Sequence, residues 1–391
     1  MRIGIVGAGA MGAFVAREIV RSAPGTELAI VDADGERAAR LAALCTQPPS
    51  AVQVCDAADV GALASAVRGC AVVANAAQYE INLEVMQAAL RAGAHYLDLG
   101  GMFHMTRRQL ALAPEFERAG LTAILGIGAA PGLSNVLARH ACQALERVES
   151  IAVSFAAAAP EAPPTAVFVP PYSIRTLMQE FCEDSMQFLE GEITAQPPLA
   201  GRRTIEFPAP IGAVDCVYTL HSEPATLPLT FRDKGVREVT WRLGLPPALE
   251  AQIAAFAAAG LGRSRPLAVA GTAIAPVEFL AACIDDNARG QRRDGVRFSE
   301  FGCVRVEARG VIGERATEVA IDCLYRDEGA PPEVAGVMTG TPAAIAALML
   351  ARGEATRPGA HGAEAVVPSE SMIRELRQRA FSIVRTVRTA L

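Results

Sequence analysis

The chain has 391 residues, of which 51% are hydrophobic and 20% are charged, and its formal net charge is -6. This composition excludes an intrinsically disordered chain and provides enough apolar residues for two domains with separate cores. The mild acidity argues against a nucleic-acid-binding protein, which normally carries a basic patch. No run reaches the ~18 apolar residues of a membrane-spanning helix.

The nine cysteines are scattered, and no two form a Cys-x-x-Cys pair. We therefore expect buried free thiols rather than a disulfide framework or a metal site, and the cytoplasm as the compartment. The run MRIGIVGAGAMG at the amino terminus breaks on glycines at once, which is not typical of a signal or transit peptide.

The first third of the chain alternates short apolar strands with helices. Residues 2–6 predict a buried strand, followed by a glycine-rich turn and a helix with apolar residues at helical spacing. Further strands are predicted at 27–32, 51–56, 71–75, 95–100 and 121–126, with helices between them. One of these helices is predicted over 107–120. The alternation predicts an α/β fold with a parallel, doubly wound sheet over residues 1–128.

The pattern changes after residue 128. A helix over 132–145 and a strand over 149–159 lead into a proline-rich stretch, and strands such as 237–243 and 304–312 follow. We expect a second, α+β domain over 129–340 with an antiparallel or mixed sheet. Helices are then predicted over 341–355 and 369–387, separated by a loop at 357–368.

Gly7, Gly9 and Gly12 form a Gly-x-Gly-x-x-Gly motif between the first strand and its helix. The first glycine permits a tight turn, the second lets the backbone approach a pyrophosphate, and the third lets the helix pack closely. The free N–H groups of the helix start, at Ala10 and Met11, would then face the phosphates. The motif predicts a dinucleotide site, with a simple tight turn as the alternative.

Asp32 ends the second strand 20 residues after Gly12, where a carboxylate binds the ribose hydroxyls of the adenosine. Because a carboxylate repels a 2′-phosphate, NAD is favoured as cofactor, while Arg37 and Arg40 downstream keep NADP open. Asp56 ends the third strand and either reaches the adenine edge or caps the next helix.

Several stretches resemble the saccharopine dehydrogenase family, lysine 6-dehydrogenases included. They are ANAAQYEINLEVMQAALRAGAHYLDLGG (74–101), GIGAAPGLSNVLARH (126–140), and VMTGTPAAIAALMLARGEA with GAHGAEAVVPSE near the carboxyl end. The resemblance implies a Rossmann domain, a substrate domain whose sheet supports a homodimer, and residues 341–391 packing back on the first domain. The stretches DLGGMFHMTRRQLAL and HSEPATLP are nearer the lysine 6-dehydrogenases.

The activity that the resemblance implies is NAD(P)-dependent oxidation or reduction at a C–NH bond of an amino acid or its secondary-amine adduct, through an imine. Such an enzyme must hold the C–H against the nicotinamide ring, take a proton from the ammonium group and bind substrate carboxylates. A carboxyspermidine-type imine reductase stays open as an alternative. So does a dinucleotide-binding protein without turnover.

Candidate site residues follow strand ends in the first domain. Asp98 ends a strand at the carboxyl edge, where it either holds the substrate ammonium or ties down the Gly100-Gly101 turn. His104 follows in a predicted loop. The resemblance places Asn75 and Tyr79 on the nicotinamide side. It also brings the backbone at Pro131 close to the cofactor.

The stretch TLHSEPATLPLTF, residues 219–231, sets an imidazole, a hydroxyl and a carboxylate side by side. Pro224 and Pro228 predict extended or turn backbone, in which His221 and Glu223 share a face. His221 is then a candidate base near neutral pH, and Glu223 would orient the imidazole or bind the amine. The alternative is a polar turn in an interdomain or dimer contact.

Overall fold

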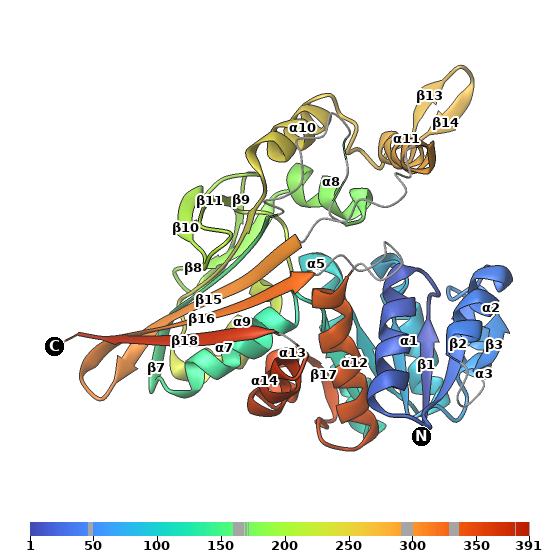
Figure 1. Cartoon of the computed structure of the whole chain (residues 1–391), viewed down its shortest axis with the longest axis horizontal. Coiled ribbons are helices and arrows are strands. Elements are labelled where there is room, and N and C mark those ends of the chain that lie inside the picture. The colour runs from blue at the N-terminus through green and yellow to red at the C-terminus, as the bar shows by residue number, and fades with distance from the viewer. Residues whose placement is uncertain are drawn as a thin grey trace.

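Figure 1 shows a computed structural model of the chain, which describes residues 1–45, 50–158, 168, 170, 172–290, 300–327, 336–379 and 381–390. A parallel sheet flanked by helices lies on one side, and a larger mixed sheet on the other. The fold class that the sequence predicts, a Rossmann-like sheet with a second α+β part, is therefore confirmed.

The first sheet has the strand order β17-β6-β5-β4-β1-β2-β3, and its pairings are all parallel. Its strands are β1 (Arg2–Val6), β2 (Glu27–Asp32), β3 (Ala51–Val54), β4 (Val72–Asn75), β5 (His95–Asp98), β6 (Thr122–Leu125) and β17 (Gly359–Gly362). Its helices are α1 (Ala10–Ser22), α2 (Gly35–Leu44), α3 (Val60–Ala66), α4 (Asn82–Ala92), α5 (Met102–Leu110) and α6 (Ala113–Arg118), with the short 3-10 helix η1 (Tyr79–Ile81) before α4.

Both faces of this sheet are buried, as the continuous apolar strands require. Ile3 and Ile5 of β1 belong to the core on one face, whereas Val6 belongs to the core on the other. In β2 the same alternation separates Ile30 from Val31. The two cores fix the register of the strands, so the strand ends that carry polar residues meet at one edge.

The second sheet is mixed. Its main order is β10-β11-β12-β7-β15-β16-β18, with β8 and β9 attached beside β12, and only the β12–β7 pair is parallel among the pairs described. The strands are β7 (Arg147–Ala158), β8 (Ser185–Leu189), β9 (Glu192–Gln196), β10 (Arg203–Glu206), β11 (Ala213–Val217), β12 (Glu238–Gly244), β15 (Glu300–Ile312), β16 (Arg315–Asp327) and β18 (Ser382–Thr389).

Helix α7 (Leu133–Gln143) packs on β15 and β16 of the second sheet, whereas α9 (Glu223–Thr230) packs on β12 and also contacts β17 of the first sheet. The short helix η2 (Arg232–Lys234) follows α9. A separate group stands above the second sheet in Figure 1. It contains α8 (Ile174–Cys182), α10 (Pro247–Ala258), α11 (Pro276–Gly290) and the hairpin of β13 (Leu267–Val269) and β14 (Thr272–Ile274).

The carboxy-terminal part differs from its prediction. The expected loop at 357–368 contains β17 and the short helix α13 (Ala363–Val366), and the expected helix over 369–387 stops early, as α14 (Ser369–Arg377). Its remainder is strand β18, because the β-branched residues of SIVRTVRT favour a strand, and all of β18 pairs with residues 317–324 of β16. Helix α12 (Val337–Ala351) packs on α1, so this part of the chain reaches both sheets.

A second difference lies in the first sheet. The single helix predicted over 107–120 is instead two helices, since α5 ends at Leu110 and α6 begins at Ala113. Pro114 stands in the first turn of α6, a position where its missing N–H costs nothing.

The structure also shows how long the apolar helices are and where the cysteines and other metal-binding side chains lie. No helix in the described ranges is long and apolar enough to cross a bilayer. The same residues contain no cluster of three or more His, Cys, Asp and Glu side chains that could hold a metal ion. All nine cysteines are free, but Cys182 and Cys283 are exposed, so the prediction of buried thiols is wrong for these two.

The α1–α12 contact is close enough to test by substitution. Gly340 is buried in α12, and a Cβ there would lie 2.2 Å from Cδ1 of Phe14 on α1. We expect Gly340→Ala to lower the free energy of unfolding by about 1–3 kcal/mol, because the overpacked helices must move apart, although alanine is the better helix former. Urea unfolding followed by circular dichroism measures this change.

Gly9→Ala is the matched control for that experiment. A Cβ at Gly9 meets no atom within 4 Å, and the φ of Gly9 is -71°, which alanine adopts without strain. Equal losses of stability in the two variants would contradict the close packing of α1 on α12.

Candidate active site

The glycine-rich turn between β1 and α1 has the shape that a pyrophosphate needs. A Cβ at Gly12 would lie 1.8 Å from the carbonyl oxygen of Gly7, and one at Gly7 would lie 2.8 Å from the Ala77 nitrogen. The space in front of Gly9 is open. Because the first N–H groups of α1, at Ala10 and Met11, have no partner inside the helix, this turn offers donors and room to a dinucleotide.

Asp32 is held at the edge of this turn by the backbone. Its Oδ2 accepts a hydrogen bond from the Ala8 nitrogen at 2.7 Å, and its Oδ1 accepts one from the Asp34 nitrogen at 2.8 Å. Nη1 of Arg37 lies 3.9 Å from Asp32 Oδ2. A carboxylate and a guanidinium thus stand together where the adenosine ribose of a dinucleotide would lie.

The helix-cap alternative for Asp56 does not hold. The N-cap of α3 is Asp59, whose Oδ1 accepts hydrogen bonds from the Gly61 and Ala62 nitrogens. Asp56 instead accepts from the Ala58 nitrogen at 2.9 Å, in the turn that precedes the helix.

Hydrogen bonds of Asn82 connect Asn75, at the end of β4, with the turn after Asp98, where the Gly100 carbonyl accepts from Asn82 Nδ2 at 3.3 Å. Asn75 donates through Nδ2 to Asn82 at 2.8 Å and accepts from the Ala77 nitrogen. Tyr79 lies in η1, and its hydroxyl donates to Gln179 of α8. Burial raises the pKa of Tyr79 to about 12, so this phenol stays protonated at neutral pH. It therefore links the first sheet to the group above the second.

Asp98 is fully engaged inside the first domain. Its Oδ1 accepts from the Gly100 and Gly126 nitrogens at 2.9 and 2.8 Å, and its Oδ2 accepts from Gln109 Nε2 at 2.6 Å and from the Tyr96 hydroxyl at 2.9 Å. Burial raises the pKa of Asp98, and these donors oppose that rise. Four donors use the hydrogen-bonding capacity of a carboxylate, which supports the alternative in which Asp98 ties down the turn.

Pro131 lies against the ends of β5 and β6. A Cβ at Gly126 would be 2.7 Å from its Cγ, and one at Gly100 would be 3.1 Å from the same ring. Glycine at both positions lets the proline ring approach, and the Pro131 carbonyl accepts from the Gly128 nitrogen at 2.8 Å. The segment that crosses between the domains is fixed on the carboxyl edge of the sheet in this way.

The predicted loop around His104 is wrong. His104 lies in α5, because Phe103, Met105, Thr106 and Gln109 are buried along that helix, and its own side chain is exposed. The helical pattern in the sequence begins at Met102, whereas the predicted helix begins five residues later, at residue 107.

His221 and Glu223 are in contact, although the backbone is not extended as predicted. Glu223 begins α9, and Pro224 stands in its first turn, where a missing N–H is tolerated. Pro228 lies inside the helix and has no N–H, so one backbone hydrogen bond of the helix is missing. The helix continues beyond it, because the Phe231 nitrogen still donates to the Leu227 carbonyl at 3.0 Å. Nδ1 of His221 pairs with Oε2 of Glu223.

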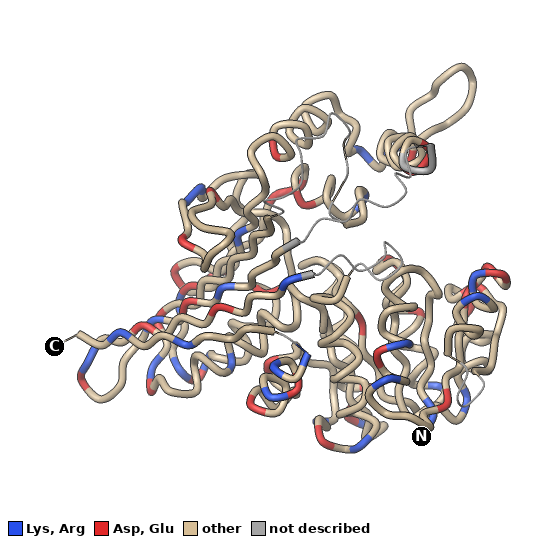
Figure 2. Tube along the Cα trace, viewed as in Figure 1, with Lys and Arg blue, Asp and Glu red and all other residues tan. Residues whose placement is uncertain are grey.

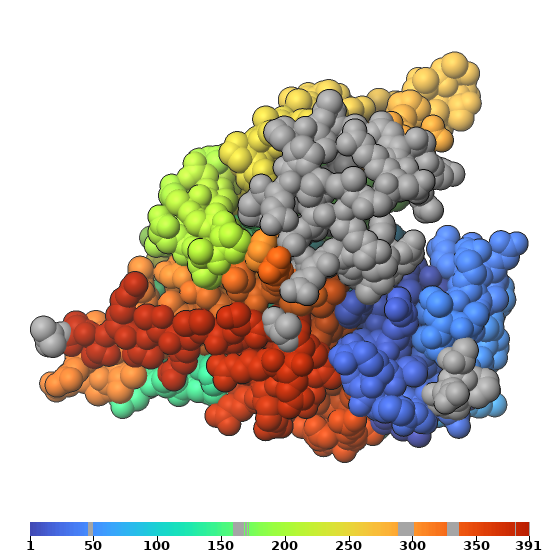
Figure 3. Space-filling view, viewed as in Figure 1, coloured from blue at the N-terminus to red at the C-terminus, as the bar shows by residue number. Residues whose placement is uncertain are grey.

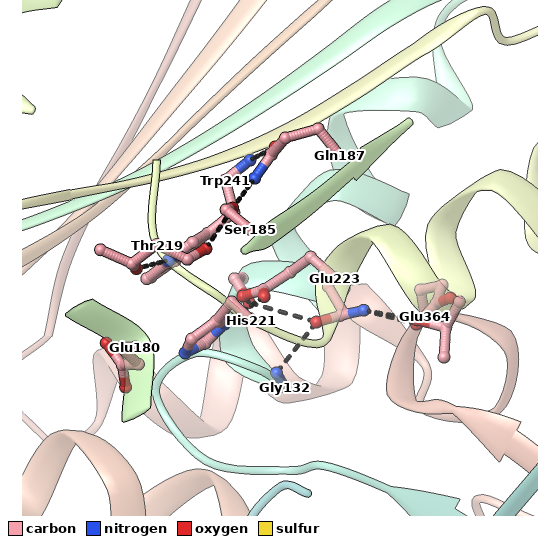
Figure 4. A network of polar contacts seen from close by, with 12 residues as sticks. Gly132, Glu180, Ser185, Gln187, Thr219, His221, Glu223, Trp241 and Glu364 are labelled. Carbon is pink, nitrogen blue, oxygen red and sulfur yellow. Dashed lines mark hydrogen bonds and ion pairs between the residues drawn. The ribbon is translucent and has the colours of Figure 1, made fainter. Parts of the chain in front are cut away.

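The imidazole of His221 stacks on Trp241 of β12, with ring centroids 3.9 Å apart and planes 12° apart. The indole is itself fixed: Nε1 donates to Thr219 Oγ1 at 2.9 Å, and the Trp241 nitrogen donates to Gln187 Oε1 at 2.8 Å. Figure 4 shows this arrangement, with Ser185 bridging Gln187 and the Thr219 carbonyl. The ring therefore has one orientation relative to the second sheet.

The second oxygen of Glu223 leads into the domain-crossing helix. Ser134 Oγ donates to Glu223 Oε1 at 2.8 Å. The neighbouring Asn135 donates from Nδ2 to Glu364 at 2.9 Å and to Thr226 at 3.1 Å. Helices α7, α9 and α13 thus meet in one buried polar network that ends on the imidazole (Figure 4).

The charges around the imidazole are mostly negative. Burial by itself lowers the pKa of His221, but the adjoining carboxylate of Glu223 and that of Glu180 outweigh it, and the net direction is upward. Burial raises the pKa of Glu180 to about 7, against the opposing effects of His221 and the Tyr172 hydroxyl, which donates at 2.8 Å. A buried site with two acids beside one imidazole stabilises positive charge.

Sequence reasoning missed Glu180 and Glu364. Glu180 belongs to α8 with no motif around it, and Glu364 falls in the expected loop. Two arginines of the second domain have partners outside this cluster: Arg175 forms an ion pair with Glu278, and Arg242 stacks on Tyr218.

Two family domains cover nearly all of the chain. Residues 3–124 match the saccharopine dehydrogenase NADP binding domain, and residues 128–381 match the saccharopine dehydrogenase C-terminal domain. The chain belongs to the saccharopine dehydrogenase family. This membership makes it an NAD(P)-binding oxidoreductase of that family.

Among curated proteins, a carboxynorspermidine synthase of Vibrio cholerae is 26% identical over 315 residues, which cover 76% of this chain and 73% of that protein. Apo saccharopine dehydrogenase (L-Glu forming) from Saccharomyces cerevisiae has the same fold over 100% of both chains, with a TM-score of 0.73 and 15% identity. Homospermidine synthase from Legionella pneumophila, crystallised with NAD, has a TM-score of 0.65 and 12% identity, over 98% of this chain and 91% of its own.

The pair of Asp32 and Arg37 predicts how cofactor preference can be changed. We expect Asp32→Ala to raise the affinity for NADPH relative to NADH roughly tenfold, a ~1.4 kcal/mol effect. The variant loses the carboxylate that repels the 2′-phosphate and frees the guanidinium to bind it. Arg37→Gln should shift the preference the other way. Fluorescence titrations with both cofactors test this, and an unchanged ratio in both variants would contradict the adenosine site described here.

Proposed function

We propose that the protein is an NAD(P)-dependent oxidoreductase that transfers hydride at the C–N bond of an amino acid or its secondary-amine adduct. The observation that carries the proposal is the imidazole of His221, stacked on Trp241 and paired with the buried carboxylate of Glu223. Glu180 adds a second acid to the same cluster. This is a site for a group that carries positive charge, as an amine or iminium does.

The cofactor and the residues around His221 have separate roles in the proposed reaction. NAD(P), held at the glycine-rich turn, supplies the hydride acceptor or donor. Glu223 accepts the Nδ1–H of His221, which leaves Nε2 to exchange a proton with the substrate nitrogen. In oxidation the neutral ring takes the proton from the ammonium group, and in reduction the imidazolium returns it. Glu180 favours a cationic substrate nitrogen, and the face of Trp241, on which the His221 ring stacks, favours the imidazolium form of that ring.

Lysine 6-dehydrogenase or saccharopine dehydrogenase-like chemistry is the first candidate within this class. The second candidate is reduction of the imine formed from an aldehyde and a diamine, as in a carboxyspermidine-type reductase. It is supported by the 26% identity to a carboxynorspermidine synthase. In the described residues near the imidazole, acids outnumber free cations, which favours recognition of amino groups over additional carboxylates.

We also propose that the enzyme is a cytoplasmic homodimer built on the second sheet, as the resemblance implies. Static light scattering of the purified protein distinguishes a dimer from a monomer.

Turnover assays separate the candidates. Purified protein is mixed with NAD or NADP and with L-lysine, saccharopine or other diamino acids, and reduced cofactor is measured by absorbance. In reverse, an amino-aldehyde with a diamine is supplied with NADH or NADPH. We expect turnover with one member of this panel. Tight cofactor binding without turnover in either direction would instead favour a non-catalytic dinucleotide-binding protein.

The cluster around His221 predicts the pH dependence. We expect oxidation to rise with pH through an apparent pKa above the ordinary histidine value of ~6.5, because the ring must be neutral to accept a proton. The apparent pKa belongs to the whole cluster, since burial raises the pKa of the neighbouring Glu180 to about 7. Glu223→Gln removes a charge that raises the His221 pKa, so its profile should shift to lower pH.

His221→Ala should lower kcat by roughly 10²–10⁴-fold with cofactor binding retained. Glu278→Gln is the control, since it removes an exposed carboxylate whose partner is Arg175, outside the cluster. Unchanged activity and pH profile in the variants at positions 221 and 223 would overturn the assignment of these roles.

A further inference from the structure

A cavity of about 500 Å³ lies on the face of the molecule formed by α7, α14, β16 and β18. Figure 3 shows the red surface of α14 and β18 side by side on this face. Three arginine side chains line the cavity, Arg374 and Arg377 from α14 and Arg385 from β18. Figure 2 shows basic positions in blue on both elements.

These arginines form no ion pair with any residue that the structure describes. Glu370 is the one carboxylate among the residues that line the cavity. Within the part of the chain that the structure describes, none of the three guanidinium groups has a carboxylate at ion-pair distance, whereas Arg379 nearby pairs with Glu18 and Glu375. Three like charges around one cavity repel each other, in a chain whose net charge is -6. An anion in the cavity would relieve that repulsion.

The cavity is also shaped to hold a ligand. Its floor contains the buried side chains of Ile321, Ile373 and Ile383, and apolar walls strengthen charge interactions above them. Nη2 of Arg377 donates to the Ile383 carbonyl at 3.1 Å, which fixes that guanidinium over the cavity. His140 of α7 is a further lining residue, and its buried Nδ1 has no hydrogen-bond partner among the described residues.

The position is separate from the candidate active site. Ser134, which binds Glu223, lies six residues before His140 on α7, about 9 Å along the helix axis. The glycine-rich turn at the start of α1 contributes no residue to the cavity.

We propose that this cavity binds a polyvalent oxyanion, a phosphate group or a polycarboxylate, through Arg374, Arg377 and Arg385. Guanidinium groups pair with both kinds of oxyanion through parallel N–H···O bonds. The Glu370 carboxylate offsets part of the positive charge of the three arginines, and it accepts a hydrogen bond from a hydroxyl group if the ligand carries one. The site is a second small-molecule site that no step of the proposed reaction uses.

Isothermal titration calorimetry tests this at constant ionic strength, with inorganic phosphate in one arm and citrate in the other. The protein is first saturated with NADH, so that its pyrophosphate site is filled and does not contribute. We expect saturable binding of at least one anion. The double variant Arg377→Gln/Arg385→Gln should weaken it by on the order of tenfold or more. Stronger binding in one arm distinguishes a phosphate site from a carboxylate site.

Arg17→Gln/Arg265→Gln is the matched control, because it removes the same charge from two exposed arginines elsewhere. It should bind as the unchanged protein does. Hydrogen exchange with mass spectrometry gives an independent readout, as the anion should protect peptides of α14 and β18. The proposal is overturned by the absence of saturable binding in both arms, or by equal binding in the two double variants. It is also overturned if the arginine variants change only the oligomeric state in light scattering. Because turnover is not the readout, these outcomes do not depend on the proposed reaction.

Discussion

A buried carboxylate is stable only when donors surround it, and this requirement organises the centre of the molecule. Glu223 has the Ser134 hydroxyl on one oxygen and the His221 imidazole on the other. Glu364 takes donors from Asn135 and Thr230. These partners come from α7, α9 and α13, which are far apart in the sequence. The three segments must therefore meet in one geometry, and the imidazole receives its orientation from that meeting.

The same requirement ties the candidate catalytic cluster to the nucleotide-binding sheet. Glu364 directly follows β17, which extends the parallel sheet beside β6, and α7 follows β6 through the segment at Pro131. The proposed site for proton transfer is thus built on an edge of the sheet whose other strands carry the glycine-rich turn and Asp32. Trp241, by contrast, belongs to β12 of the second sheet. His221 lies between the two sheets and is fixed from both sides.

The sequence was sufficient for features whose physical cause is local. The alternation of strands and helices, and the glycine spacing at 7, 9 and 12, depend on neighbours within one turn or one strand, and the structure contains them. His221 and Glu223 are in contact, but the extended backbone from which that contact was predicted is wrong, since Glu223 begins α9. Glu180 and Glu364 could not be found, because their importance comes from partners far away in the chain. His104 was wrongly placed in a loop, because the burial of its neighbours makes that segment helical. The segment 382–389 was wrongly expected to continue a helix, because pairing with β16 makes it a strand.

The path of the chain between the two sheets has a consequence for the evolution of this protein. The chain leaves the parallel sheet after β6, builds most of the mixed sheet, returns for α12 and β17, and then ends as β18 on the mixed sheet. Neither sheet is encoded by one uninterrupted stretch of codons. A single recombination event therefore cannot exchange the nucleotide-binding half for another. New substrate ranges are more accessible through changes inside the mixed sheet and its covering helices than through the shuffling of domains.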